Sequence, residues 1–103
     1  MTYRFTAEVP LRWVDVDSEG VVNHAVYLSL IEQARFQYFD QLGLLPDRRV
    51  SFLLKEATMR FQRPGLVGMR TTVAARTVRL QDSSFVMAYE VRGDGEVLAE
   101  GQA

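Results

Sequence analysis

The hydrophobic periodicity of the chain changes twice along its length, and these changes restrict the folds that it can adopt. Between residues 3 and 13, apolar or small side chains alternate with polar ones, as in a strand with one buried face. From Asn23 to Leu42, apolar residues recur every three or four positions, as in an amphipathic helix. Alternation returns at Ala57 and continues almost to the C-terminus. One strand, one long helix and a group of strands predict an α+β domain with an antiparallel sheet.

The helix has recognisable signals at both ends. Asn23 is a good N-cap, and Gly43 lies where a C-cap glycine is usual. The apolar stripe between them is widened by Leu28, Leu30 and Phe39, and it consists of Tyr27, Ile31, Ala34, Tyr38 and Leu42. So broad an apolar face indicates a helix partly wrapped by a curved sheet.

Turn residues divide the strand regions. Pro10 cannot donate a ladder hydrogen bond, so we expect it at an edge or a bulge of the first strand. Gly93-Asp94-Gly95 is a strong hairpin signal. The four later strands are expected around residues 57–62, 71–75, 85–91 and 97–102. The chain ends at Ala103 inside the last of them, which we therefore expect to be truncated.

Composition narrows the class of protein further. A chain of 103 residues predicts one domain, and its 48% hydrophobic residues exclude a disordered chain. Such a small domain buries proportionally little surface, so association with other copies would help to cover the rest. The absence of cysteine excludes disulfides and cysteine nucleophiles, and a single histidine leaves little for a zinc or iron site. We therefore expect no cofactor and no metal.

The charge and the N-terminus indicate where the protein works. A net charge of −1 does not predict nucleic-acid binding. The sequence MTYRFTAEV contains no long apolar run, so neither a signal peptide nor a membrane span is expected. A cytoplasmic location is the expectation.

The candidate chemistry lies in a loop that carries Asp15, Asp17 and Glu19 just before the helix. A calcium loop would need glutamate at its twelfth position, which is Val26. A plain turn, capped by its own aspartates, is a second explanation. The third is acyl transfer, because a carboxylate there could act as nucleophile or general base beside helix N–H groups that bind an oxyanion. His24 could add a donor, or be an ordinary first-turn histidine.

The segment LRWVDVDSEGVVNHAVYLSLIEQAR, Leu11–Arg35, resembles the signature of the 4-hydroxybenzoyl-CoA thioesterase family. The stretches MRFQRPGLVG and SSFVMAYEV also resemble the second and fourth strands of that family. The resemblance implies a hotdog fold, in which about five antiparallel strands curve around one long central helix. It also implies hydrolysis of an acyl-CoA thioester.

The resemblance also suggests roles for individual residues. The second aspartate of the family's D-x-D motif is catalytic and matches Asp17 here. The family's oxyanion donor is a backbone N–H at the helix start, which matches the region of His24, with Asn23 and Tyr27 as neighbouring substrate-binding candidates. Family members form dimers or tetramers with the acyl pocket at an interface, so a homodimer or homotetramer is expected.

Two departures from the family pattern stand out. Some members carry a basic run at the third turn to hold the CoA phosphates, but here that turn reads Gln81-Asp82-Ser83-Ser84. Arg76, Arg79 or another subunit would have to supply those contacts. Members also usually continue through a full fifth strand and a short tail, whereas this chain ends at Ala103.

Other functions remain as alternatives. No G-x-S-x-G motif is present, which argues against a serine hydrolase. A hotdog enoyl-CoA hydratase would have its Asp and His five residues apart, whereas Asp17 and His24 are farther apart. A non-catalytic module that binds acyl-CoA or acyl carrier protein would have little use for Asp17. The sequence leaves open the acyl group, the choice between CoA and carrier protein, and whether Asp17 attacks directly or activates water.

Overall fold

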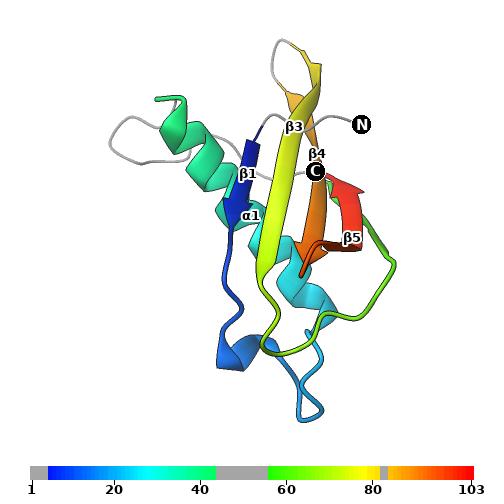
Figure 1. Ribbon diagram of the computed structural model, residues 1–103. Helices are drawn as coiled ribbons and strands as arrows, with labels where there is room; N and C mark the ends of the chain where they lie inside the picture. The colour runs from blue at the N-terminus through cyan, green and yellow to red at the C-terminus, as the bar shows by residue number, and fades with distance from the viewer. Residues whose placement is uncertain (1–4, 44–55, 82–83) are drawn as a thin grey trace.

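The structure is a computed structural model that describes residues 5–43, 56–81 and 84–103. Its five strands form one antiparallel sheet in the order β1-β3-β4-β5-β2. Within these residues one α-helix, α1, runs across one face of this sheet (Figure 1). The elements are β1 (Phe5–Glu8), the 3-10 turn η1 (Trp13–Asp15), α1 (His24–Gln41), β2 (Thr58–Phe61), β3 (Thr71–Leu80), β4 (Phe85–Gly93) and β5 (Glu96–Gln102). The α+β hotdog architecture expected from the sequence is confirmed.

The hydrophobic core lies between α1 and the inner face of the sheet. Directly opposed residues share a face, and Ala75 of β3 pairs with Tyr89 of β4, both of them buried. The helix contributes Tyr27, Leu30, Ile31 and Ala34 to this core. The predicted stripe is therefore correct except at its end, because Leu42 is 51% exposed. Leu42 is the C-cap residue, and it lies beyond the last turn that faces the sheet.

The ends of α1 form as their local signals predict. The side chain of Asn23 accepts a hydrogen bond from the Ala25 N–H at 3.2 Å, which satisfies one free donor of the first turn. Gly43 has a φ of 73°, the left-handed conformation in which glycine ends a helix. Leu44, Leu45 and Pro46, which the sequence places after the cap, lie outside the described residues.

The N-terminal strand ends earlier than the alternation predicts, so the expectation of a strand that reaches Trp13 was wrong. β1 ends at Glu8, although the Val9 N–H still donates to Thr71 O at 3.1 Å. Pro10 then removes a backbone donor, and the chain turns into η1. As a result Trp13, expected on the buried face, is 81% exposed.

The sheet is completed by tight turns and a close strand contact. Asp94 and Gly95 both have positive φ, which confirms the predicted hairpin between β4 and β5. β5 is not an edge strand, because it pairs with β4 on one side and β2 on the other. A Cβ at Gly101 would lie 2.2 Å from Thr58 O, so only glycine allows β2 to approach β5 this closely.

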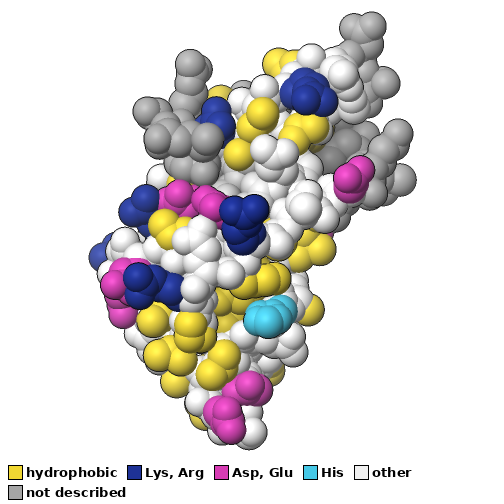
Figure 2. Space-filling model, turned by 90° about the vertical axis from the view of Figure 1, so that its right-hand side faces the viewer, with side chains coloured by type: hydrophobic (Ala, Val, Ile, Leu, Met, Phe, Trp, Pro, Cys, Tyr) yellow, Lys and Arg dark blue, Asp and Glu magenta, His cyan; other side chains and the backbone are white. Residues whose placement is uncertain are grey.

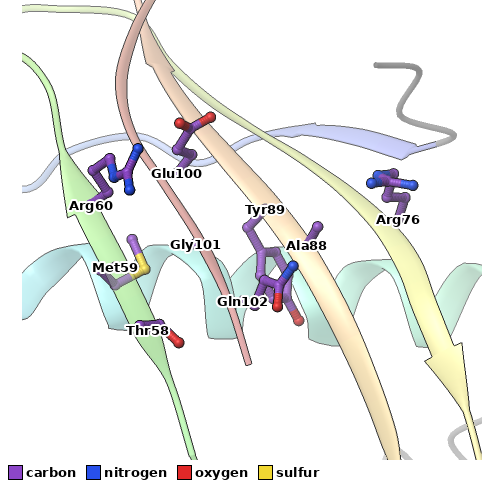
Figure 3. A pocket seen from close by; sticks show the side chains of 9 residues that line it. All are labelled: Thr58, Met59, Arg60, Arg76, Ala88, Tyr89, Glu100, Gly101 and Gln102. Atoms are coloured by element: carbon purple, nitrogen blue, oxygen red, sulfur yellow. The ribbon is translucent and has the colours of Figure 1, made fainter.

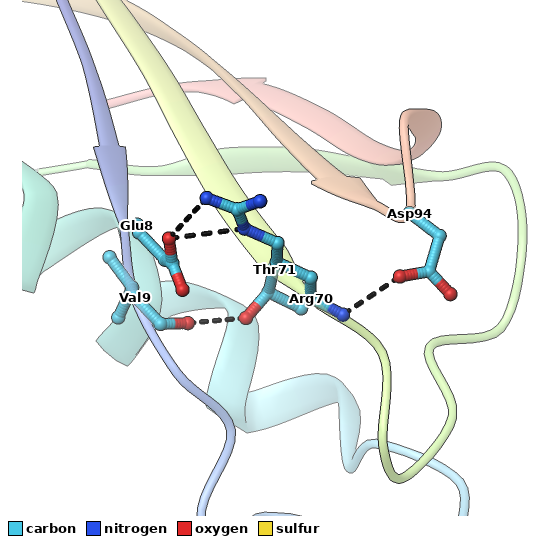
Figure 4. A network of polar contacts seen from close by, with 5 residues as sticks. All are labelled: Glu8, Val9, Arg70, Thr71 and Asp94. Atoms are coloured by element: carbon cyan, nitrogen blue, oxygen red, sulfur yellow. Dashed lines mark hydrogen bonds and ion pairs between the residues drawn. The ribbon is translucent and has the colours of Figure 1, made fainter.

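A polar network joins the first strand to the β4–β5 hairpin through Arg70 (Figure 4). The Arg70 guanidinium donates to Glu8 Oε2 at 2.9 and 3.1 Å, and its backbone N–H donates to Asp94 Oδ1 at 2.9 Å. The Thr71 hydroxyl donates to Val9 O beneath it. The ion pair is exposed and contributes little stability, so the network mainly fixes where the chain leaves β1. No helix among the described residues is long and apolar enough to cross a membrane.

Candidate active site

The first aspartate of the loop is buried and fully engaged in the structure of its own turn. The Asp15 carboxylate accepts hydrogen bonds from the Arg12 N–H at 2.7 Å and from Arg12 Nη2 at 2.9 Å. Arg12 holds the pKa of the Asp15 carboxyl below its usual range, chiefly through the side-chain hydrogen bond. The carbonyl of Asp15 accepts from the Asn23 N–H at 3.0 Å. Asp15 therefore ties the loop to the residue that caps α1.

The second aspartate, Asp17, is exposed and only half engaged. Its Oδ1 accepts from the N–H groups of Glu19 at 2.9 Å and Val21 at 3.1 Å, which closes an Asx-type turn. Within the described part of the chain, no donor reaches the other oxygen, Oδ2. Positive φ at Gly20 allows the chain to reverse at this point. The turn thus fixes the carboxylate and leaves one of its oxygens available.

The loop is held against the segment that follows β2. Val22 N–H donates to Gly65 O at 2.8 Å, and Val67 N–H donates to Gly20 O at 2.8 Å. A β-bridge joins Val21 to Leu66. The Asp17 side chain closes the turn from within. These backbone contacts hold the whole turn against the segment after β2.

His24 is the first residue of α1, and its side chain is exposed. No acceptor for its backbone N–H is found among residues 5–43, 56–81 and 84–103, as is usual for the first turn of a helix. Its imidazole stacks on Phe61, with ring centroids 4.4 Å apart and planes 19° apart. The neighbouring candidate Asn23 uses its side chain as the helix cap.

Tyr27, one turn along the helix, is buried, and its hydroxyl accepts a hydrogen bond from the Gly65 N–H at 3.1 Å. Burial raises the pKa of this phenol, so it stays protonated at neutral pH. The hydroxyl therefore anchors the loop after β2 and helps to shape the site.

A cavity of about 260 Å³ lies at the start of α1, where hydrophobic side chains gather around the histidine (Figure 2). His24 and Tyr27 line it, but Asp17 does not. Its other lining residues are Val21, Val22, Phe61, Gln62, Arg63 and Pro64. Of the sequence candidates, a single chain thus brings His24 and Tyr27 together and leaves Asp17 outside the cavity. Phe61 was missed as a site residue, because strand alternation gives its face but not its partners.

A second cavity, of about 590 Å³, lies on the face of the sheet that points away from α1 (Figure 3). Arg76 of β3 lines one side of it, Arg60 of β2 and Glu100 of β5 line the other, and Ala88 and Gly101 lie between them. The other sequence candidate, Arg79, is exposed near the end of β3, past an irregularity between Thr77 and Arg79, and does not line the cavity. Of the two arginines, Arg76 therefore lines this cavity and Arg79 does not.

The carboxylates of the loop are engaged mainly by donors of the loop itself. Arg12 occupies the Asp15 carboxylate, and backbone N–H groups hold one oxygen of Asp17. In the described ranges, no three His, Cys, Asp or Glu side chains come together as metal ligands. These carboxylates therefore cap donors of the loop that leads into α1.

Comparison with known proteins identifies the family. A sequence model of the Thioesterase-like superfamily matches residues 11–103. The acyl-CoA thioesterase YbgC of Helicobacter pylori is 31% identical over 78 residues, which cover 75% of this chain and 59% of that protein. The chain therefore spans less than two thirds of the length of this relative.

Solved structures agree with this match. A thioesterase from Thermus thermophilus, determined in complex with coenzyme A and Zn, is 35% identical, with a TM-score of 0.85. The alignment covers 97% of this chain and 75% of that one. A hypothetical protein from the same species is 30% identical, with a TM-score of 0.87 over 95% of this chain and 78% of its own. By its sequence and by its hotdog fold, the chain belongs to the thioesterase-like superfamily.

Proposed function

We propose that the protein hydrolyses acyl-CoA thioesters to a free acid and CoA. The observation that carries this proposal is a backbone donor, the His24 N–H, that has no acceptor among the described residues and lies at the edge of a cavity with both apolar and polar walls in a chain of this superfamily. Such a donor suits the oxyanion that forms when a thioester carbonyl is attacked. Asn23 supports it by capping the helix, and Tyr27 forms part of the cavity wall.

Asp17 is the proposed catalytic carboxylate, because its Oδ2 is available while Oδ1 fixes its position. As a general base it would take a proton from water, whose oxygen adds to the thioester carbon. As a nucleophile it would form an anhydride that water then hydrolyses. In both cases the C–S bond breaks, and the sulfur leaves as CoA thiolate, which is then protonated. The His24 N–H would hold the negative oxygen meanwhile.

A second copy of the chain would complete this site. Asp17 does not line the cavity of its own chain, so we propose that the carboxylate of one protomer serves the cavity of its partner. Two exposed apolar residues next to the loop, Trp13 and Val14, are suited to burial in such a contact. A homodimer, or a tetramer built from two dimers, would follow.

The phosphate end of CoA would lie on the outer face of the sheet. Arg76 and Arg60 flank the larger cavity, and guanidinium groups bind phosphate well. No ion pair joins Arg60 to a described carboxylate, although Glu100 lies directly opposite it on β5. Arg79, the other arginine proposed from the sequence, would at most add a longer-range attraction.

The test is thiol release from a panel of aliphatic and aromatic acyl-CoAs, together with the mass of the protein by light scattering. Release of CoA by a dimer or tetramer supports the proposal. Binding of acyl-CoA without thiol release would identify a non-catalytic module instead. Addition of water to an enoyl-CoA would identify a hydratase.

A further inference from the structure

Phe61 forms the wall of the cavity that faces the start of α1. It is the last residue of the edge strand β2, and it remains 42% exposed. The His24 imidazole lies flat against its ring, at 4.4 Å between centroids, and Tyr27 meets the ring edge-on at 5.2 Å and 70°. All three side chains line the same cavity. A single aromatic residue of the sheet thus contacts both site residues of the helix.

We infer that Phe61 is a positioning residue that holds the His24 imidazole at the mouth of the cavity. The inference deepens the proposed thioester hydrolysis and rests on it, because an imidazole held there would add a side-chain donor beside the backbone N–H that receives the oxyanion. His24 lies in the first helical turn with an exposed side chain, so without a partner its ring would sample several rotamers. Stacking on Phe61 favours one of these rotamers by on the order of 2- to 10-fold.

The position of Phe61 depends in turn on Tyr27 and on the loop at Gly65. Its edge-on contact with Tyr27 fixes the ring, and Tyr27 is fixed in turn by the hydrogen bond from the Gly65 N–H at 3.1 Å. A Cβ at Gly65 would lie 2.8 Å from the Tyr27 hydroxyl oxygen, so the backbone must come this close. The series Gly65, Tyr27, Phe61 and His24 therefore links the loop after β2 to the one histidine of the chain.

The stack can be tested without any assay of activity, because His24 is the only histidine and its ring signals in an NMR spectrum are unambiguous. Phe61→Leu keeps the residue apolar but removes the ring, so the His24 ring protons should move towards the shifts of a free imidazole. Phe61→Tyr should keep the shifts near those of the unmutated protein. Phe85→Leu is the matched control, because it removes an edge-on partner of Phe39 elsewhere in the fold. Unchanged His24 shifts in Phe61→Leu would overturn the inference.

A kinetic cycle tests whether the stack matters for turnover. Phe61→Leu should lower kcat for an acyl-CoA by about 2- to 10-fold, the loss expected when the held rotamer is no longer favoured. The same change in a His24→Ala background should have no further effect, because the group that Phe61 positions is gone. Phe61→Tyr, which keeps an aromatic ring, should turn over at nearly the rate of the unmutated protein. Thermal unfolding should establish that each variant folds.

The possible failures can be told apart. Additive effects of Phe61→Leu and His24→Ala, with normal activity of the unmutated protein, would show that Phe61 does not act through His24. That result overturns the role of Phe61 alone. If the unmutated protein releases no thiol from any acyl-CoA, the proposed function fails and the role of Phe61 in it fails too.

Discussion

Asp15 and Asp17 are two positions apart in the same loop and have opposite environments. Asp15 is buried, and its oxygens accept from the backbone and guanidinium of Arg12. Asp17 is exposed, and only one of its oxygens is used, by the N–H groups of its own turn. A carboxylate with both oxygens engaged by donors serves structure, while one with a fixed position and an available oxygen can serve chemistry.

The two arginines that were considered for CoA binding also differ in their surroundings. Arg76 and Arg79 both lie on β3, but Arg76 lines the outer cavity and Arg79 does not. The irregularity between Thr77 and Arg79 changes the register with β4 between them. The two residues are of the same type, so their positions in the sheet decide which of them faces the cavity.

The largest expected effect concerns Asp17. Asp17→Asn keeps the acceptor oxygen that closes the turn but removes basicity, so kcat should fall by on the order of 10²- to 10⁴-fold with little change in KM. His24→Ala should lose less, because the backbone N–H survives the substitution. Thiol-release kinetics measure both, and circular dichroism should show unchanged secondary structure. A larger loss of kcat in Asp15→Asn than in Asp17→Asn would reverse the assignment.

The next largest effect is a loss of stability in a variant of Asp15. Asp15→Asn replaces a charged acceptor of the Arg12 hydrogen bonds with a neutral amide, which should reduce the free energy of unfolding by about 1–3 kcal/mol. Asp17→Asn should change it by less than about 0.5 kcal/mol, because its side chain is exposed. Urea unfolding of the two variants side by side gives both values. Equal losses would mean that both aspartates are structural.

Acid should weaken the contact between Asp15 and Arg12. The pKa of Asp15 is lowered in the folded state, so its contribution to stability is fully present above the unfolded value of about 4 and is lost as pH falls through the lowered value. The free energy of unfolding of the unmutated protein should therefore decrease below about pH 4 by more than that of Asp15→Asn. Parallel pH curves for the two proteins would show that the Arg12 contact does not stabilise the anion in solution.

The smallest expected effect is a change in KM when Arg76 or Arg79 is replaced. Arg76→Gln should raise KM for an acyl-CoA by roughly 5-fold, about 1 kcal/mol, with kcat nearly unchanged. It should not affect a pantetheine thioester, which lacks the nucleotide phosphates. Arg79→Gln should change KM less. If Arg79→Gln has the larger effect, or if both substrates respond equally to Arg76→Gln, the outer cavity does not bind the phosphates.

Sequence patterns predicted those parts of the molecule that depend on local signals. Asn23, Gly43 and the Gly93–Gly95 turn each determine their own backbone conformation, and each forms as expected. Trp13 shows where this fails, because alternation cannot show that Pro10 and the Arg12–Asp15 turn divert the chain before Trp13 reaches the core.

The site was predictable only in part, for a similar reason. A motif can mark Asp17 and His24 as candidates, but it does not show which cavity each side chain reaches. The contact of Phe61 with His24 joins residues 37 positions apart and arises only when β2 packs beside the start of α1. That Asp17 lies outside the cavity of its own chain is likewise a property of the folded loop.

The central claim is that Asp17 performs chemistry and does not merely bind the substrate. The most direct test is titration of an intact acyl-CoA into the Asp17→Asn variant, with thiol release followed in the same sample. We expect binding with a Kd close to that of a non-hydrolysable analogue on the unmutated protein, while the thioester stays intact over many wild-type turnovers. Loss of binding in Asp17→Asn, or hydrolysis at the wild-type rate, would contradict the account.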